Sequence, residues 1–265
     1  MEDLLAWVIL FLVSTVIGLY GILVGAGGGF ILTPILLLLW GLEPALAVGT
    51  SIIAVWLNAL AASISYLRNR RINFKLGLTV GAFAIPGSIL GALLLGNVNN
   101  NAFSLIFGAL LVLLGAYMLR RPGASHPLRD SSLSPESVIP PSPGIQRAVG
   151  LPFLGFCIGG LSSFLGVGGG FILTPALVYI FRTPIGIATA TAIFAIVLFA
   201  GTGAVTHLIL GNINWAVLFP VALGMVTGGQ LAVRLSSKVS GLWVIKLLSL
   251  GLIALGITLF QRAFI

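Results

Sequence analysis

Apolar segments occupy almost the whole chain and are separated only by short polar turns. Many reach or exceed the ~20 residues that a helix needs to span a bilayer. In lipid every backbone polar group must be satisfied within the protein, so only helices and closed barrels cross a membrane. The apolar runs are continuous rather than alternating, which argues against a barrel. We therefore predict an all-α, polytopic membrane protein with ten apolar segments, at about 4–24, 30–41, 45–67, 75–96, 102–119, 147–166, 171–181, 185–209, 215–235 and 243–261.

Charged residues are too few to cover a water-exposed surface. They make up 7% of the 265 residues, whereas soluble domains carry about 25%. The formal net charge of +8 comes from bases that gather in short stretches between apolar runs, and this pattern orients membrane proteins. We expect the lipid bilayer as a partner and no nucleic acid.

An eight-residue block divides the chain into two repeats. Gly27–Pro34 (GGGFILTP) recurs without change as Gly168–Pro175, at an offset of 141 residues. Between the repeats lies a stretch rich in proline and serine, a composition typical of a linker without a core of its own. The predicted organisation is a first transmembrane repeat at 1–119, a linker at 120–146 and a second repeat at 147–265.

Charge predicts that the repeats have opposite orientations. The loop after the third segment carries Arg68, Arg70, Arg71 and Lys75, whereas its counterpart, Gly211–Asn214, carries no charge. Basic loops stay in the cytoplasm, and five segments per repeat, an odd number, invert the second repeat. We expect an inner-membrane protein whose basic loop and linker face the cytoplasm. The two termini and the turn at 97–101 are expected outside.

The segments at 30–41 and 171–181 are too short to span the membrane. Twelve helical residues reach ~18 Å, against ~30 Å of hydrocarbon. Each segment follows a glycine run that favours a helix break, so helices are expected to restart near Phe30 and Phe171. A helix start carries free N–H groups and partial positive charge, which together favour an anion. The predicted site comprises Gly28, Gly29, Phe30, Thr33, Gly169, Gly170, Phe171 and Thr174, with Thr50 and Thr191 on the following helices. The alternative is that the glycines only allow close helix packing.

His207 is a candidate for a gate or a proton-linked group within a helix, and the alternative is a structural histidine facing the membrane interface. The acidic residues fall outside the predicted mid-membrane region, which argues against a buried carboxylate for cation coupling. The spans contain no Ser/His/Asp set, carboxylate pair or metal cluster. We therefore expect no enzyme activity, no cofactor and no metal.

The two glycine blocks, their spacing and the proline-rich centre resemble the TauE/SafE family, also called the sulfite exporter or TSUP family. The resemblance covers nearly the whole chain apart from residues 120–146. It implies a transporter that moves sulfite, organosulfonates or related sulfur-containing organic anions, usually outward. Together with the repeats, we expect a secondary transporter that works by alternating access around the central site at the two helix starts. A passive anion channel and an uptake carrier for another sulfur oxyanion remain alternatives. The sequence leaves the particular anion, the coupling ion and the oligomeric state open.

Overall fold

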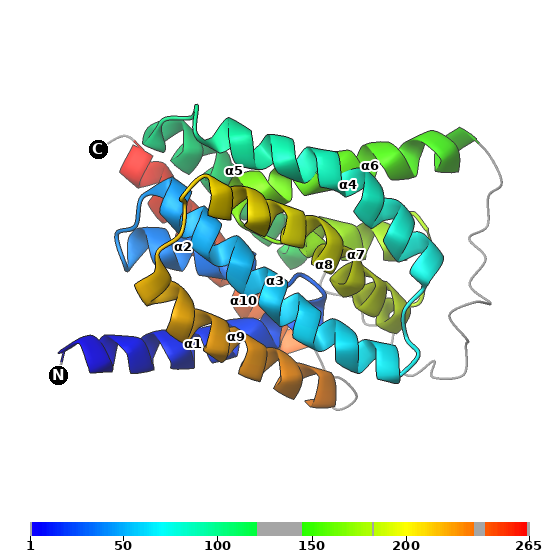
Figure 1. The fold of residues 1–265 in the computed structure, drawn as a ribbon, viewed down its shortest axis with the longest axis horizontal. Coiled ribbons are helices and arrows are strands. Elements are labelled where there is room, and N and C mark those ends of the chain that lie inside the picture. Colours follow the sequence, from blue (N-terminus) through cyan, green and yellow to red (C-terminus); the bar gives the residue numbers. More distant parts are fainter. Residues whose placement is uncertain (1, 121–144, 182, 236–241, 264–265) are drawn as a thin grey trace.

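The computed structural model describes residues 2–120, 145–181, 183–235 and 242–263. Over these residues the chain is a bundle of helices (Figure 1), which confirms the all-α prediction. Of the predicted linker at 120–146, residues 121–144 lie outside the described residues. In chain order the helices are α1 (Glu2–Val24), α2 (Gly29–Leu38), α3 (Pro44–Arg68), α4 (Phe74–Leu95), α5 (Asn100–Arg120), α6 (Ile145–Leu165), α7 (Gly170–Tyr179), α8 (Ile185–Ile209), α9 (Trp215–Leu235) and α10 (Leu242–Ala263).

Helix length separates the spanning elements from the broken ones. Among the described residues, α1, α3, α4, α5, α8 and α9 contain stretches long and apolar enough to cross a membrane. The helices α2 and α7 have only 10 residues each, or about 15 Å. The predicted short helices after the glycine runs are therefore present.

The same capping residues occur in both halves. Asn73 precedes α4 and its side-chain oxygen accepts a hydrogen bond from the Leu76 N–H (3.1 Å), and Asn214 does the same for the Val217 N–H (3.2 Å) before α9. Such caps satisfy N–H groups that the first helical turn leaves without partners. Each pair is separated from its counterpart by the 141-residue offset of the repeat.

The turns after α3 and α8 also share one backbone motif. In each turn two backbone hydrogen bonds, one nested inside the other, run from the residues after the helix back to its last turn, and one residue of the turn has positive φ. In the second half this residue is Gly211, with φ 74°, and in the first half it is Arg70, with φ 51°. Glycine enters this region freely, whereas another L-residue pays about 1–2 kcal/mol. Arg70 is thus a strained residue at a position where the equivalent turn has glycine.

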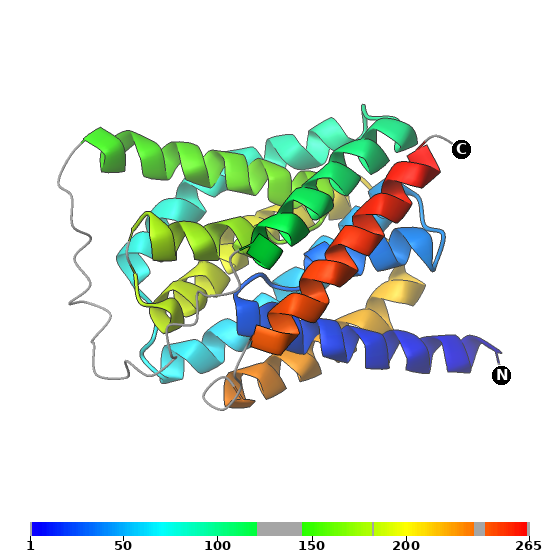
Figure 2. The same cartoon turned by 180° about the vertical axis from the view of Figure 1, so that it is seen from behind.

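Helices are exchanged between the two halves of the sequence. The first-half helix α4 packs against α6 and α8, whereas the second-half helix α9 packs against α1 and α3. The remaining pair, α5 and α10, packs together and crosses one face of the bundle (Figure 2). The packing groups are therefore α1, α3 and α9 on one side and α4, α6 and α8 on the other.

Glycine brings the exchanged helices close together. A methyl group at Gly228 of α9 would overlap the Thr15 carbonyl of α1, and one at Gly91 of α4 would overlap the Gly160 carbonyl of α6. Small residues at such contacts let helix backbones approach in a membrane, where packing rather than water exclusion drives association.

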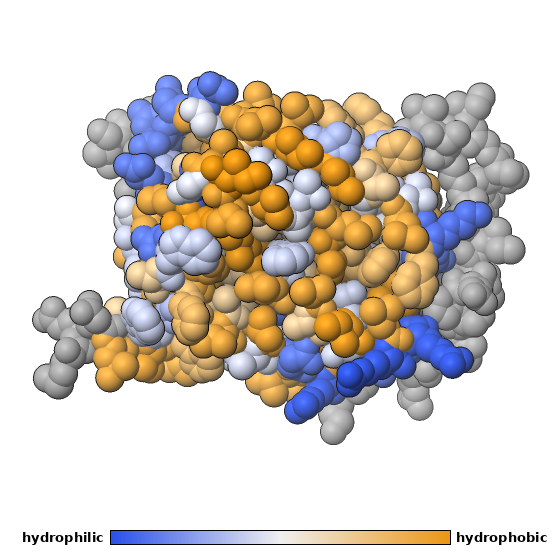
Figure 3. Space-filling view, viewed as in Figure 1, coloured by the Kyte–Doolittle hydropathy of each residue, from blue (hydrophilic) through white to orange (hydrophobic). Residues whose placement is uncertain are grey.

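The two ends of the bundle hold different turns. The α3–α4 turn, the end of α9 and the start of α6 lie at one end, and both termini with the α4–α5 and α8–α9 turns lie at the other (Figure 1). Hydrophobic residues cover the middle of the visible face (Figure 3), as a lipid-facing surface requires. The helices α1 and α6 run in opposite directions along the long axis (Figure 1). The orientation of the two repeats relative to the membrane stays a prediction.

Candidate functional site

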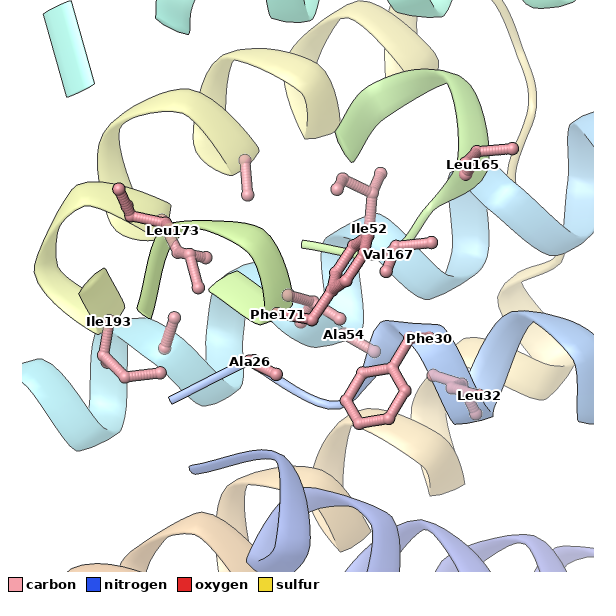
Figure 4. Packing of buried hydrophobic residues seen from close by; sticks show 14 of the residues in the cluster. Ala26, Phe30, Leu32, Ile52, Ala54, Leu165, Val167, Phe171, Leu173 and Ile193 are labelled. Carbon is pink, nitrogen blue, oxygen red and sulfur yellow. The ribbon is translucent and has the colours of Figure 1, made fainter. Parts of the chain in front are cut away.

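The two glycine loops meet in the middle of the bundle. A methyl group at Gly29 would overlap the carbonyl oxygen of Gly166, and one at Gly170 would overlap that of Gly25. The loops are therefore in direct backbone contact, which only glycine permits. The Phe30 and Phe171 rings, on the helices that follow the loops, lie with their centroids 6.3 Å apart. Figure 4 shows these rings close to the loop residues Ala26 and Val167.

The glycine loops direct the N-terminal ends of α2 and α7 toward this centre. Gly28 and Gly169 are the residues before the two helices, and both have positive φ, 103° and 68°. The sharp reversal before each helix needs this left-handed conformation, which glycine adopts at low cost. The glycine run therefore sets both the break in the helix and the direction of the helix that restarts.

Backbone N–H groups at the two helix starts have no hydrogen-bond acceptor among the described residues. The first N–H groups with a partner are those of Ile31 and Leu32, which donate to the Gly28 carbonyl, and the second half repeats the pattern at Ile172 and Leu173. The N–H groups without a partner belong to Gly28, Gly29, Phe30, Gly169, Gly170 and Phe171, all of which are buried. Buried N–H groups without partners are rare in proteins, and helix starts carry partial positive charge. This arrangement can hold an anion.

The hydroxyl groups of Thr33 and Thr174 tie each short helix to the opposite loop. Thr33 donates to the Gly166 carbonyl at 3.1 Å, and Thr174 donates to the Gly25 carbonyl at 3.0 Å. In the described conformation these hydroxyl protons hold the loops together. Contact of either hydroxyl with an anion stays a prediction.

Thr50 and Thr191 lie buried on α3 and α8 and anchor the turns at the two ends of the bundle. The Thr50 hydroxyl oxygen accepts the Asn214 N–H, and the Thr191 hydroxyl oxygen accepts the Asn73 N–H, each at 3.0 Å. Neither hydroxyl has a hydrogen bond to a glycine loop. The structure thus brings eight of the ten predicted site residues to one centre and places these two threonines at the flanking turns.

His207 is fully buried in α8 and both of its ring nitrogens have partners. Its Nε2 lies 2.9 Å from the Ser163 carbonyl oxygen, and its Nδ1 lies 3.2 Å from the side-chain nitrogen of Asn212. A carbonyl only accepts, so Nε2 carries the proton and Nδ1 accepts from the amide. The side chain therefore lies within the bundle and does not face the membrane interface, and the alternative of a structural histidine stays open. A gating or proton-linked role stays a prediction.

Among the residues whose burial is described, the centre holds no charged side chain. No Asp, Glu, Lys or Arg of this set is buried, and Glu43 and the cations lie near helix ends. The electrostatic character of the centre therefore comes from backbone dipoles and hydroxyl groups rather than from charged side chains.

The profile of a known family matches almost the whole of this framework. Its description is "Sulfite exporter TauE/SafE", and it matches residues 10–259, which include both glycine loops and all ten predicted site residues. The chain belongs to the TauE/SafE family.

Relatives of this TauE/SafE protein are similar along most of their length. The probable membrane transporter protein YunE of Bacillus subtilis is 28% identical, over 95% of this chain and 96% of its own. A probable membrane transporter protein of Haemophilus influenzae is 32% identical, over 79% and 78%. The probable membrane transporter protein MJ0441 of Methanocaldococcus jannaschii is 26% identical, over 90% of each chain. No solved structure matches the chain.

Ser51 of this TauE/SafE protein also contacts the glycine loops and was not predicted from the sequence. Its hydroxyl donates to the Gly166 carbonyl at 2.9 Å, so this carbonyl accepts from both Thr33 and Ser51. The only sequence signal was a break in the repeat, because the position equivalent to Ser51 is Ala192. The two halves of the site are therefore not chemically identical.

Proposed function

We propose that this protein is a secondary transporter for small anions, with sulfite and organosulfonates as the first candidates. One observation carries the proposal: two helix starts meet in a buried centre, and their first N–H groups have no acceptor in the part of the chain that the structure describes. Such groups bind an anion without a cationic side chain. The choice of sulfur oxyanions rests on the description of the family.

Movement by alternating access fits the packing. The centre is closed in the described conformation, since Val55, Ile196 and Met225 pack directly against the loop glycines. An anion therefore reaches the N–H groups only when the two packing groups separate on one side. Halves that repeat the same contacts can open on either side in equivalent ways, and we infer that they are inserted with opposite orientations.

The proposed role requires no chemical conversion, so we expect the substrate to leave unchanged and no enzyme activity. Following the family description, we propose export across the cell membrane, with the basic α3–α4 turn in the cytoplasm. A passive channel differs from the proposed exporter in its kinetics, and an uptake carrier for another sulfur oxyanion differs in the direction of net flux and in the anion carried.

The test uses purified protein in proteoliposomes with radiolabelled sulfite as the probe. A carrier gives saturable flux, and unlabelled sulfite on the opposite side accelerates the exchange of label. Flux that rises linearly with concentration and shows no exchange would indicate a channel. Vesicles that move neither sulfite nor a sulfonate such as taurine or sulfoacetate would reject the proposal.

A further inference from the structure

Arg70 occupies a strained position whose equivalent in the second half is Gly211. Both residues have positive φ within the same backbone turn. Strain of this kind persists where the surrounding structure or the function requires it, and it gathers at functional sites. The side chain that distinguishes Arg70 from Gly211 is a long, exposed cation.

Other cations surround Arg70 at the same end of the bundle. Arg68 and Arg71 flank it and Lys75 begins the next helix, and the side chains are exposed or half-buried. Figure 3 shows hydrophilic residues gathered over the ends of α3 and α9. The α3–α4 turn therefore carries a cluster of four cations rather than a single charged residue.

A fifth cation joins the cluster from α9. Ser65 of α3 donates a hydrogen bond to the side-chain oxygen of Gln230 of α9 at 3.0 Å. Arg68 follows Ser65 by three residues on α3, and Arg234 follows Gln230 by four residues on α9. Both cations therefore lie about one helical turn beyond this hydrogen bond. No ion pair to a carboxylate is found for these cations among the described residues, where Glu43 directly precedes α3 at the other end of the bundle.

The basic α3–α4 turn is hydrogen-bonded to α8, and α8 also contacts the central site. The Asn73 N–H donates to Thr191 of α8, and α8 contacts the glycine loops through Ile196, five residues later. At the opposite end the equivalent turn is anchored to Thr50 of α3 and carries no charge. The two ends therefore share one framework and differ in charge.

We propose that Arg68, Arg70, Arg71 and Lys75, with Arg234, form an anion-collecting mouth at the α3–α4 end of the transport path. This proposal rests on the proposed function and adds the side from which the anion is collected. A cluster of one sign raises the local concentration of the oppositely charged substrate and its rate of association. The neutral α8–α9 turn at the other end gives no such attraction, so the apparent affinity differs between the two sides.

The test changes charge after folding, so that membrane insertion is unaffected. Cys157 is the only cysteine, and Arg70→Cys in a Cys157→Ala background provides one reactive thiol. The purified variant is alkylated with iodoacetate, iodoacetamide or (2-bromoethyl)trimethylammonium, which add a negative, a neutral or a positive group through a thioether that sulfite does not cleave. The KM for sulfite is then measured from each side of proteoliposomes made of neutral lipid. Gly211→Cys is the matched control, because Gly211 is the equivalent of Arg70 in the uncharged turn, is exposed, and an added side-chain carbon there would meet no atom within 4 Å.

We expect KM from the α3–α4 side to rise by about tenfold from the positive to the negative adduct at low salt. The difference should shrink as the Debye length falls from about 30 Å at 0.01 M salt to about 8 Å at 0.15 M. KM from the opposite side should not change with the charge at residue 70. An equal KM for all three adducts, while sulfite flux is retained, would overturn the mouth and leave the transporter proposal intact. Absence of sulfite flux in the unlabelled parent would instead reject the transporter.

Anionic lipid headgroups present the same oxyanion chemistry as the substrate, so a second set of vesicles contains anionic phospholipid. A charge effect that appears only in these vesicles would show that the cluster binds headgroups, and it would overturn the proposal. Arg70→Gly gives a further check, because it removes both the strain and the cation. We expect its melting temperature to match or exceed that of the parent while KM from the α3–α4 side rises. Unchanged KM in Arg70→Gly would contradict the proposal.

Discussion

The Thr174 hydroxyl donates to the carbonyl of Gly25, a residue 149 positions earlier in the chain, at 3.0 Å. This bond has a symmetric equivalent from Thr33 to Gly166, but the Gly166 carbonyl also accepts from Ser51. Loss of the Thr33 hydroxyl and loss of the Thr174 hydroxyl are therefore expected to have different effects, although the two threonines occupy equivalent positions of the repeat. This difference makes the roles of the two threonines separable by experiment.

We expect Thr174→Val to be more damaging than Thr33→Val. Valine keeps the shape but removes the hydroxyl, and a buried carbonyl that loses its donor costs about 1–3 kcal/mol. In Thr33→Val the Gly166 carbonyl keeps its bond from Ser51. Thermal unfolding in detergent and sulfite flux should therefore be impaired more in Thr174→Val, and Thr33→Val with Ser51→Ala should match it. Equal effects of the two single substitutions would contradict this explanation.

Alanine at Gly29 or Gly170 should abolish transport. Each new methyl group would overlap a carbonyl oxygen of the opposite loop, and backbone cannot move aside as a flexible side chain can. We expect a large loss of stability together with the loss of flux. Gly186→Ala is the matched control, because Gly186 also lies in the first turn of a helix and its added methyl would meet no atom within 4 Å. A Gly29→Ala protein with parental stability and flux would show that the loops separate easily.

The role of His207 can be tested by the dependence of flux on pH. Protonation would turn Nδ1 into a donor that faces the side-chain nitrogen of Asn212, so the amide would have to rotate. If His207 is proton-linked, flux changes as the pH falls from neutral into the acidic range, and His207→Gln removes the change. Taurine or sulfoacetate is the better probe, because its sulfonate does not titrate in this range whereas sulfite does. A pH profile that is the same in the variant and the parent would leave His207 with a structural role.

Cysteine labelling tests the orientation of the two repeats. In the Cys157→Ala background we expect Arg70→Cys to react only from the cytoplasmic side of the membrane. Asn99→Cys and Asn212→Cys, in turns at the other end of the bundle, should react from outside in intact cells. An impermeant thiol reagent and a permeant one distinguish the two faces. Labelling of residue 70 from outside would contradict the predicted topology.

The periodic features of the sequence predicted the helices, including the two short helices that follow the glycine runs. The glycine block placed the short helices at 30–41 and 171–181, and they are found at Gly29–Leu38 and Gly170–Tyr179. The equivalence of two positions, however, does not say what each of them contacts. The partner of Thr33 lies on the opposite loop, and α4 packs on helices of the second half. Such contacts depend on the spatial relation of the repeats, which an offset along the chain does not contain.

His207 illustrates the same difference between position and environment. Its place near the end of a helix suggested the membrane interface, because the sequence gives depth along a helix but not the direction of the side chain. The polar partners that allow its burial, Ser163 and Asn212, come from another helix and from the following turn. A buried imidazole is stable only with such partners, and the sequence did not reveal that α6 supplies one of them.

The exchange of α4 and α9 also has a consequence for biogenesis. When the ribosome has completed α5, neither α6 nor α8, on which α4 packs, has been synthesised. The nascent first half therefore waits in lipid with the glycine-rich face of α4 uncovered. Conversely, α1 and α3 acquire α9 only near the end of translation. Assembly of both packing groups thus follows insertion of nearly the whole chain, and a ribosome that stalls between the repeats leaves a fragment in which α4 lacks both of its helical partners.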